Sequence, residues 1–169
     1  MPTTSRDVQS ESMLAPLDIP NTHLVFNQSP VFAGYNAFAD DPVLQVLCRG
    51  LSPSVRNELE EHGKWAGSLD AMELARQANR NPPVLKCFDA KGNRVDQVEF
   101  HPAWHSLMDR AISLGMHASC WQELPRESGQ RHQARAARYY ITAGVEMGHL
   151  CPITMTNACV AALIKSPEI

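Results

Sequence analysis

The sequence predicts an all-α domain of five or six helices with one small β-hairpin. Three observations lead to this prediction. Apolar residues recur at helical spacing through most of the chain after residue 41. Proline or glycine marks nearly every expected helix boundary. A glycine-containing turn, "AKGN", lies between two short β-rich runs, "VLKCFD" and "RVDQVEF", which is typical of a hairpin.

The first three helices are each expected to begin at a side chain that can cap a helix N-terminus. Proline follows two of these side chains, at a position where its missing N–H costs nothing. The expected N-caps are Asp41, Ser52 and Ser68. Gly50 offers an end for the first helix, and Gly63 or Gly67 for the second. "NPP" at 81–83 closes the third, because a residue before proline avoids helical geometry.

Three further helices are expected after the hairpin. His101-Pro102 starts the first of them, which ends near Gly115 and continues after a break through 116–122. A loop is expected over 125–130. The last two helices are expected over 130–147, with Gly148 as the stop, and over 152–165.

Composition excludes several function classes. The 169 residues include 15 basic and 18 acidic side chains, a net charge of −3, whereas nucleic-acid-binding domains are usually strongly basic. No apolar run reaches the roughly 18 residues of a membrane span. The N-terminal stretch is polar and lacks the apolar region of a secretory signal. Five cysteines without a CxxC pair fit a reducing compartment, so we expect a cytoplasmic protein with buried free thiols.

The chain divides into two expected parts. Residues 1–22 are polar and proline-containing and are predicted to be a flexible tail. Residues 23–169 are predicted to form the helical domain, which begins with an extended arm at "HLVFNQ" that docks on this chain or on a neighbouring subunit.

Two groups of side chains are candidates for binding. One group is a set of arginines at helical spacing: Arg131, Arg135 and Arg138. Because arginine suits phosphate contacts, they could form a nucleic-acid-binding face. The simpler interpretation is that these side chains face solvent or pair with carboxylates of a neighbouring helix or subunit. The other group is His101 and His105, which are four positions apart and could chelate a metal from one helix face, but the spacing specifies no third ligand. The favoured interpretation is that His101 caps the helix and His105 is a partly buried, hydrogen-bonding aromatic side chain. We therefore predict no metal site.

No catalytic residue is assigned, because the sequence contains no nucleophile elbow, phosphate-binding glycine loop or diagnostic acid pair. The final segment "CPITMTNACVAALIK" is apolar almost all round, so it is expected to be buried in a larger protein or an interface. This pattern suggests the front part of something longer.

Several of these segments resemble a known family. The stretches "ARQANRNPPVLKCFDAKGNRVDQVEFHPAWHSLM" and "ARAARYYITAGVEMGHLCPITMT", with the early "HLVFNQ", are similar to the N-terminal domain of the AidB-type DNA alkylation response proteins, a branch of the acyl-CoA dehydrogenase superfamily. The resemblance runs from about residue 23 to residue 169.

The resemblance implies the helical N-terminal domain of a flavoprotein whose middle β-domain and C-terminal helical domain are absent here. The full-length family is tetrameric, binds FAD and duplex DNA, and has weak acyl-CoA dehydrogenase-like activity. Pro152, Thr154, Met155 and Thr156 then become candidates for the wall of the flavin and acyl cavity. The chain alone is expected neither to hold FAD tightly nor to oxidise acyl-CoA, and a stand-alone nucleic-acid-binding module remains the alternative.

Overall fold

The computed structural model describes residues 26–121 and 130–166. Residues 32–169 form one compact unit, which contains every helix and strand of the described ranges. Residues 26–31, the described part of the other unit, contain no helix or strand. The predicted boundary at residue 22, the start of the arm and the predicted loop over 125–129 lie outside the described residues.

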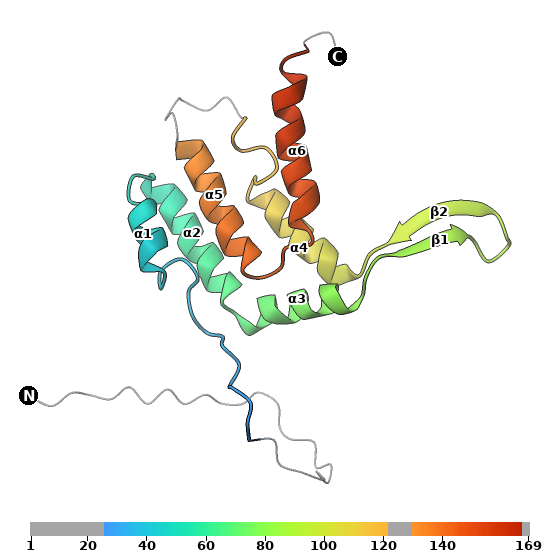
Figure 1. Ribbon diagram of the computed structural model, residues 1–169, viewed down its shortest axis with the longest axis horizontal. Coiled ribbons are helices and arrows are strands. Elements are labelled where there is room, and N and C mark those ends of the chain that lie inside the picture. Colours follow the sequence, from blue (N-terminus) through green and yellow to red (C-terminus); the bar gives the residue numbers. More distant parts are fainter. Residues whose placement is uncertain (1–25, 122–129, 167–169) are drawn as a thin grey trace, which may run out of the picture. The chain divides into compact units, whose positions relative to one another are not determined.

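The fold is mostly helical, as predicted (Figure 1). The helices are α1 (Pro42–Leu47), α2 (Pro53–Ala66), α3 (Leu69–Arg80), α4 (Pro102–Ser113), α5 (Gln130–Ala143) and α6 (Leu150–Leu163). The strands β1 (Val84–Phe88) and β2 (Arg94–Glu99) form an antiparallel two-stranded sheet between α3 and α4 in the chain.

The predicted caps begin the first four helices. The Asp41 carboxylate accepts hydrogen bonds from the backbone N–H groups of Val43 and Leu44. Ser52 and Ser68 cap α2 and α3, and Nδ1 of His101 accepts the N–H of Ala103 at the start of α4. These bonds satisfy N–H groups that have no partner inside a helix, which explains why each helix starts where it does.

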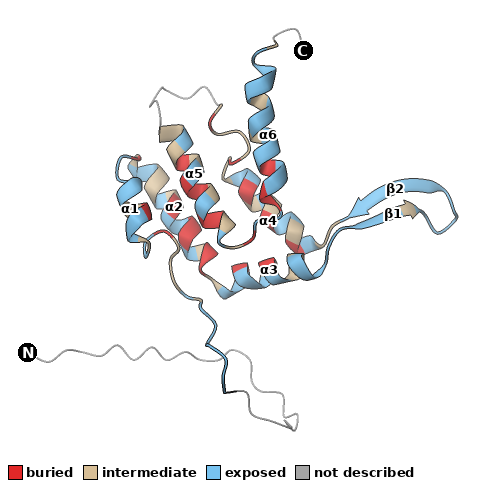
Figure 2. Ribbon diagram, in the orientation of Figure 1, coloured by how far each residue is buried: buried red, intermediate tan, exposed pale blue. Residues whose placement is uncertain are grey.

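The hairpin depends on its turn. Asp89 accepts the backbone N–H groups of Lys91 and Asn93, and Gly92 adopts a φ of 84°, a left-handed conformation that glycine reaches at no steric cost. The register pairs Val84 with Glu99 and contains an irregularity between Lys86 and Phe88. Both faces are exposed along almost the whole length of the hairpin (Figure 2).

The core consists of two apolar clusters. One joins α1, α2 and α5 and includes the fully buried Phe38 and Leu59. The other joins α4, the turn at Met116 and the start of α6, through Ala111, Leu150 and Ile153. Helix α2 packs against α3 and α5, and α4 packs against α3 and α6.

The segment before α1 crosses closely over the end of α2. The backbone N–H of Gly34 donates to the carbonyl of Gly67, and that of Ala37 donates to the carbonyl of Gly63. A Cβ atom on Gly67 would lie 1.9 Å from the Tyr35 carbonyl oxygen, so only glycine allows this approach. Of the two predicted ends of this helix, Gly67 is therefore correct, and Gly63 lies within the helix.

Several predicted boundaries differ from the structure. Helix α1 ends at Leu47, with Cys48 as its C-cap, before the predicted Gly50. Residues 116–121 form turns rather than a continued helix, because Gly115 has a φ of 67° and its carbonyl accepts the N–H groups of Ala118 and Ser119. Helix α5 ends at Ala143, before the predicted residue 147. Helix α6 begins at Leu150, before the predicted Pro152. Pro152 is tolerated there because the first-turn N–H groups of a helix have no helical acceptor.

Candidate functional site

The four candidate cavity-wall residues lie on the exposed part of α6. Pro152, Met155 and Thr156 follow each other at helical spacing, and the Met155 side chain is 66% exposed. Thr154 is also exposed, but its hydroxyl donates to the Tyr139 hydroxyl of α5 at 3.0 Å. Three candidates thus share one face, and the fourth is hydrogen-bonded to α5.

Helix α6 as a whole is less buried than its composition predicts. Its buried residues are Leu150 and Ile153, both near its beginning. Figure 2 shows that the rest of the helix is mostly exposed. No charged residue lies between Leu150 and Ile164, so this exposed surface is neutral; it is mostly apolar, with the hydroxyl groups of Thr154 and Thr156 as polar exceptions.

The candidate arginines of α5 do not share one environment. Arg138 is buried, and its guanidinium binds the Glu58 carboxylate of α2 through two hydrogen bonds, of 2.5 Å from Nε and 3.2 Å from Nη2. Nε of Arg135 donates to the Met116 carbonyl at 2.6 Å, and its guanidinium lies 5.4 Å from the Tyr139 ring centroid. Arg131 is half-buried and lines a pocket of about 520 Å³ that Arg138 also lines.

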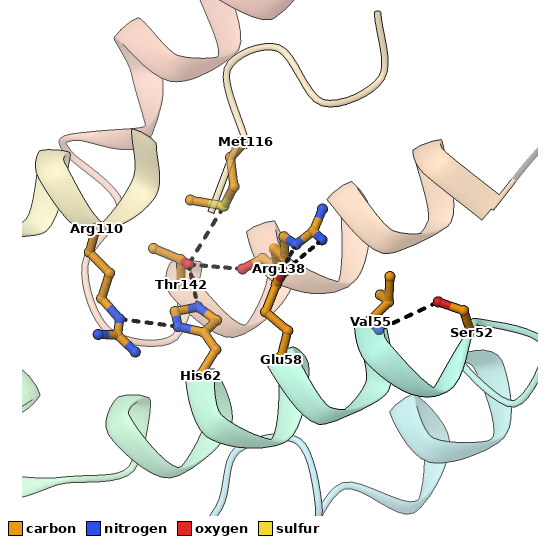
Figure 3. A network of polar contacts seen from close by, with 8 residues as sticks. All are labelled: Ser52, Val55, Glu58, His62, Arg110, Met116, Arg138 and Thr142. Atoms are coloured by element: carbon orange, nitrogen blue, oxygen red, sulfur yellow. Dashed lines mark hydrogen bonds and ion pairs between the residues drawn. The ribbon is translucent and has the colours of Figure 1, made fainter. Parts of the chain in front are cut away.

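A buried polar network joins α2, α4 and α5 (Figure 3). His62 of α2 lies between Arg110 of α4 and Thr142 of α5, and its side chain is 1% exposed. The Arg110 guanidinium also lies 4.0 Å from the centroid of the Trp65 ring, which stacks on the His62 ring. Three helices are thus connected through one imidazole.

The hydrogen bonds of His62 define its tautomer. Nε of Arg110 donates to Nδ1 at 3.3 Å, so Nδ1 carries no proton. Nε2–H then donates to the Thr142 hydroxyl at 2.9 Å, and that hydroxyl donates to the Arg138 carbonyl at 2.8 Å. Burial, and next the positive charge of Arg110, lower the pKa of His62 from 6.5 to about 4.

His62 is therefore a neutral structural imidazole. Its donor and its acceptor are both in use, and neither is available for proton transfer or for a metal ion.

A second buried pair lies at the corner between α5 and α6. Nδ1 of His149 and Oε2 of Glu146 are 2.7 Å apart, and both residues are buried. The Glu146 carboxylate also accepts the N–H groups of Gly148 and His149, at 2.6 and 3.1 Å. Burial acts to raise the pKa of Glu146, but these hydrogen bonds outweigh it and keep that pKa below its usual value.

This pair fixes the turn that precedes α6. The Glu146 carboxylate accepts the N–H groups of Gly148 and His149, which lie just before the first residue of the helix, Leu150. Among the described residues, Nε2 of His149 has no hydrogen-bond partner. The pair is thus a buried turn contact with one unused nitrogen.

The histidines of α4 have structural surroundings. His101 caps the helix as expected, and His105 is exposed with its ring edge toward Trp104, at a centroid distance of 5.3 Å. In the described ranges no three His, Cys, Asp or Glu side chains are grouped to hold a metal ion. None of the helices described there has the length and hydropathy to cross a membrane.

Sequence spacing did not identify the polar network. His62 and Thr142 are 80 positions apart, as are Glu58 and Arg138. The Glu58 side chain is 42% exposed and still pairs with the buried Arg138, a contact between helices that no local pattern indicates. Glu146 and His149 are three positions apart, so their contact is local in the chain and was open to prediction from spacing.

Sequence comparisons with known proteins identify the family of the chain. The family model of the adaptive response protein AidB N-terminal domain matches residues 27–169. The putative acyl-CoA dehydrogenase AidB of Escherichia coli (strain K12) is 40% identical over 145 residues, which are 85% of this chain and 26% of that protein. Acyl-CoA dehydrogenase family member 11 of Caenorhabditis elegans is 29% identical over 136 residues, 76% of this chain and 21% of that protein.

Two solved structures have a similar fold over most of this chain. The structure described as Bd2924 apo-form superposes with a TM-score of 0.72 and 26% identity, over 82% of this chain and 28% of that one. Caenorhabditis elegans ACDH-11 in complex with C11-CoA gives a TM-score of 0.68 and 25% identity, over 86% of this chain and 25% of that one. The chain thus spans about a quarter of the length of these relatives.

Proposed function

Because the chain belongs to the family of AidB N-terminal domains, within the acyl-CoA dehydrogenases, we propose that it forms one wall of a flavin and acyl cavity in an AidB-like protein. The observation that carries this proposal is the exposed neutral face of α6. Apolar helix surfaces of this kind are normally covered in a larger structure or an interface. The chain spans 26% of the Escherichia coli relative, so most of such a cavity would come from other parts of the protein.

The residues of α6 fit a wall and not a complete cofactor site. Met155 and Pro152 offer apolar contact of the kind a flavin ring or an acyl chain needs. The Thr156 hydroxyl donates to the Pro152 carbonyl, which leaves its oxygen as an acceptor. However, the helix has no positive charge to bind the phosphates of FAD. When bound, FAD supplies the hydride chemistry; this chain contributes packing and exclusion of water.

The same proposal includes assembly and biological role. We propose that the chain supports a tetramer through surfaces it leaves exposed, and that the assembled protein acts in the response to DNA alkylation. The description of the matching family as an adaptive response protein supports the second part.

The experiment that tests the wall uses a chimera. The segment of the Escherichia coli relative that aligns with this chain is replaced by this chain, and FAD content per subunit and oligomeric state are measured. Met155→Glu should lower FAD content several-fold, because it places a negative charge on the surface proposed to contact the flavin ring. Met72→Glu, the same change at an exposed methionine of α3, is the matched control and should leave FAD content unchanged.

Equal FAD content in both variants would contradict the wall. A stoichiometric yellow flavin on the purified chain by itself, with acyl-CoA turnover, would contradict the proposal that this chain contributes only one side of the site.

The alternative hypothesis of a nucleic-acid-binding module has less support. Arg138 is bound to Glu58 and buried, which leaves its charge largely neutralised. Binding through Arg131 and Arg135 would weaken with salt, at about one unit of log–log slope per phosphate. A duplex-binding titration at several salt concentrations decides it: a slope near zero, or no binding, rejects the module.

A further inference from the structure

An aromatic pocket lies between the segment that precedes α1 and the C-terminal end of α5. Its volume is about 720 Å³, within the ~300–1,000 Å³ range of small-molecule sites. Three aromatic side chains line it: Phe32, Tyr35 and Tyr140. The Phe32 and Tyr35 rings are stacked, with centroids 4.5 Å apart. Small apolar side chains, among them Ala66 and Val145, form much of the remaining wall.

Among the described residues, the charged side chains that line this pocket are both acidic, Asp40 and Asp41. No lysine, arginine or histidine of the described ranges lines it. Asp41 is held in place by the N–H groups of Val43 and Leu44 and by the Tyr140 hydroxyl, which donates at 3.2 Å. The N–H of Leu44 is the main reason that the pKa of Asp41 lies below its usual value, so this carboxyl is ionised at neutral pH.

These features select one class of ligand. An aromatic face attracts cations through its quadrupole, and nearby carboxylates add long-range attraction. An inorganic divalent ion would need several free oxygen ligands, whereas the Asp41 oxygens already accept three hydrogen bonds. A neutral apolar ligand would use the rings but would gain nothing from the two carboxylates.

We propose that this pocket binds a small organic cation of the alkylated ammonium class, with the alkyl groups against the aromatic and aliphatic wall and the charge near Asp40 and Asp41. This proposal goes beyond the wall of the flavin cavity and does not depend on it, because none of the α6 residues discussed above lines this pocket.

The test compares two probes of nearly equal shape. The full chain is labelled with ¹⁵N and titrated with choline and, separately, with 3,3-dimethyl-1-butanol, its neutral isostere, at constant ionic strength. Choline should shift the amide signals of Gly144 and Val145 in a saturable manner. The neutral alcohol should bind about two- to fivefold more weakly, the discrimination that an exposed cation–π contact provides.

Three variants identify the groups responsible. Tyr140→Leu removes a ring that is 61% exposed and should weaken choline binding several-fold at little cost in stability. Asp40→Asn should weaken choline binding and leave alcohol binding unchanged, because it removes only a charge. Asp109→Asn, the same change on the exposed surface of α4, should alter neither.

Equal affinity for the two probes would overturn the proposal and identify an apolar pocket without charge selection. Absence of saturable shifts with choline, or binding that survives Tyr140→Leu unchanged, would overturn it as well.

Discussion

His62 shows how one buried side chain makes stability depend on pH. Its pKa in the folded chain, about 4, is lower than the 6.5 of an unperturbed histidine. Between these values the unfolded chain binds a proton more readily than the folded chain, so stability falls as the pH drops through this window. Above pH 6.5 the contribution is fully present.

We expect the free energy of unfolding to fall by about 2 kcal/mol between pH 7 and pH 5 because of His62. Urea denaturation at the two pH values measures this loss. His62→Gln is the matched variant, because glutamine can accept from Arg110 and donate to Thr142 without titrating. If the loss is as large in this variant, His62 is not its source.

The two partners of the Glu58–Arg138 ion pair are buried to different degrees. The Arg138 side chain is 9% exposed and that of Glu58 is 42% exposed. Glu58→Gln leaves a mostly buried guanidinium with a weaker partner, and it should cost about 1–2 kcal/mol, below the range for fully buried pairs.

Urea denaturation at pH 7 gives this cost directly. Glu61→Gln, on the exposed surface of the same helix, should change stability by less than about 0.5 kcal/mol. Equal effects of the two substitutions would mean that the ion pair adds nothing to stability.

At the scale of elements, the start of a helix was easier to predict than its end. Asp41, Ser52, Ser68 and His101 are visible in the sequence because a cap and the helix it begins are adjacent. The end of α5 depends on a turn in which the Thr142 carbonyl accepts the N–H groups of Val145 and Glu146, and apolar periodicity does not report that turn.

The candidate site was predictable to a lesser degree. The candidate cavity-wall residues of α6 came from the family resemblance of local sequence segments. Contacts such as His62 with Thr142 depend on which helices pack together, and spacing along the chain carries no record of that packing.

The close approach at Gly67 gives a prediction for the junction of α2 and the segment before α1. In Gly67→Ala, the new methyl group would meet the Tyr35 carbonyl, and the segment would have to move. We expect a loss of about 1–3 kcal/mol in the free energy of unfolding. Gly50→Ala is the matched control, since nothing lies within 4 Å of its added Cβ. Thermal melts of both variants measure this loss. Equal stability of Gly67→Ala and Gly50→Ala would mean that the contact between residue 67 and the Tyr35 carbonyl is not tight.

At the scale of the whole molecule, large apolar side chains are exposed on several elements. The exposed side chains include Met155 and Leu163 of α6, Ile164 directly after it, and Leu85, Phe88 and Val98 of the hairpin, each at least 48% exposed. A two-stranded hairpin without a packed face is marginally stable in water. Such surfaces favour association.

We expect the purified chain to be colourless and to self-associate as its concentration rises. Light scattering with an absorbance spectrum in the same run measures both properties. Met155→Glu together with Leu163→Glu should reduce the association, because both changes place charge on the apolar face of α6. A concentration-independent monomer would contradict this expectation.

The corner between α5 and α6 has a consequence for how substitutions combine. One carboxylate, that of Glu146, both accepts two N–H groups of the turn before α6 and holds the His149 ring. Once either residue is replaced, much of the benefit of keeping the other is already gone. The effects of the two replacements on stability should therefore sum to more than the effect of the double replacement. Natural variation at these two positions would then be expected to be correlated, with Glu146 and His149 kept or lost together.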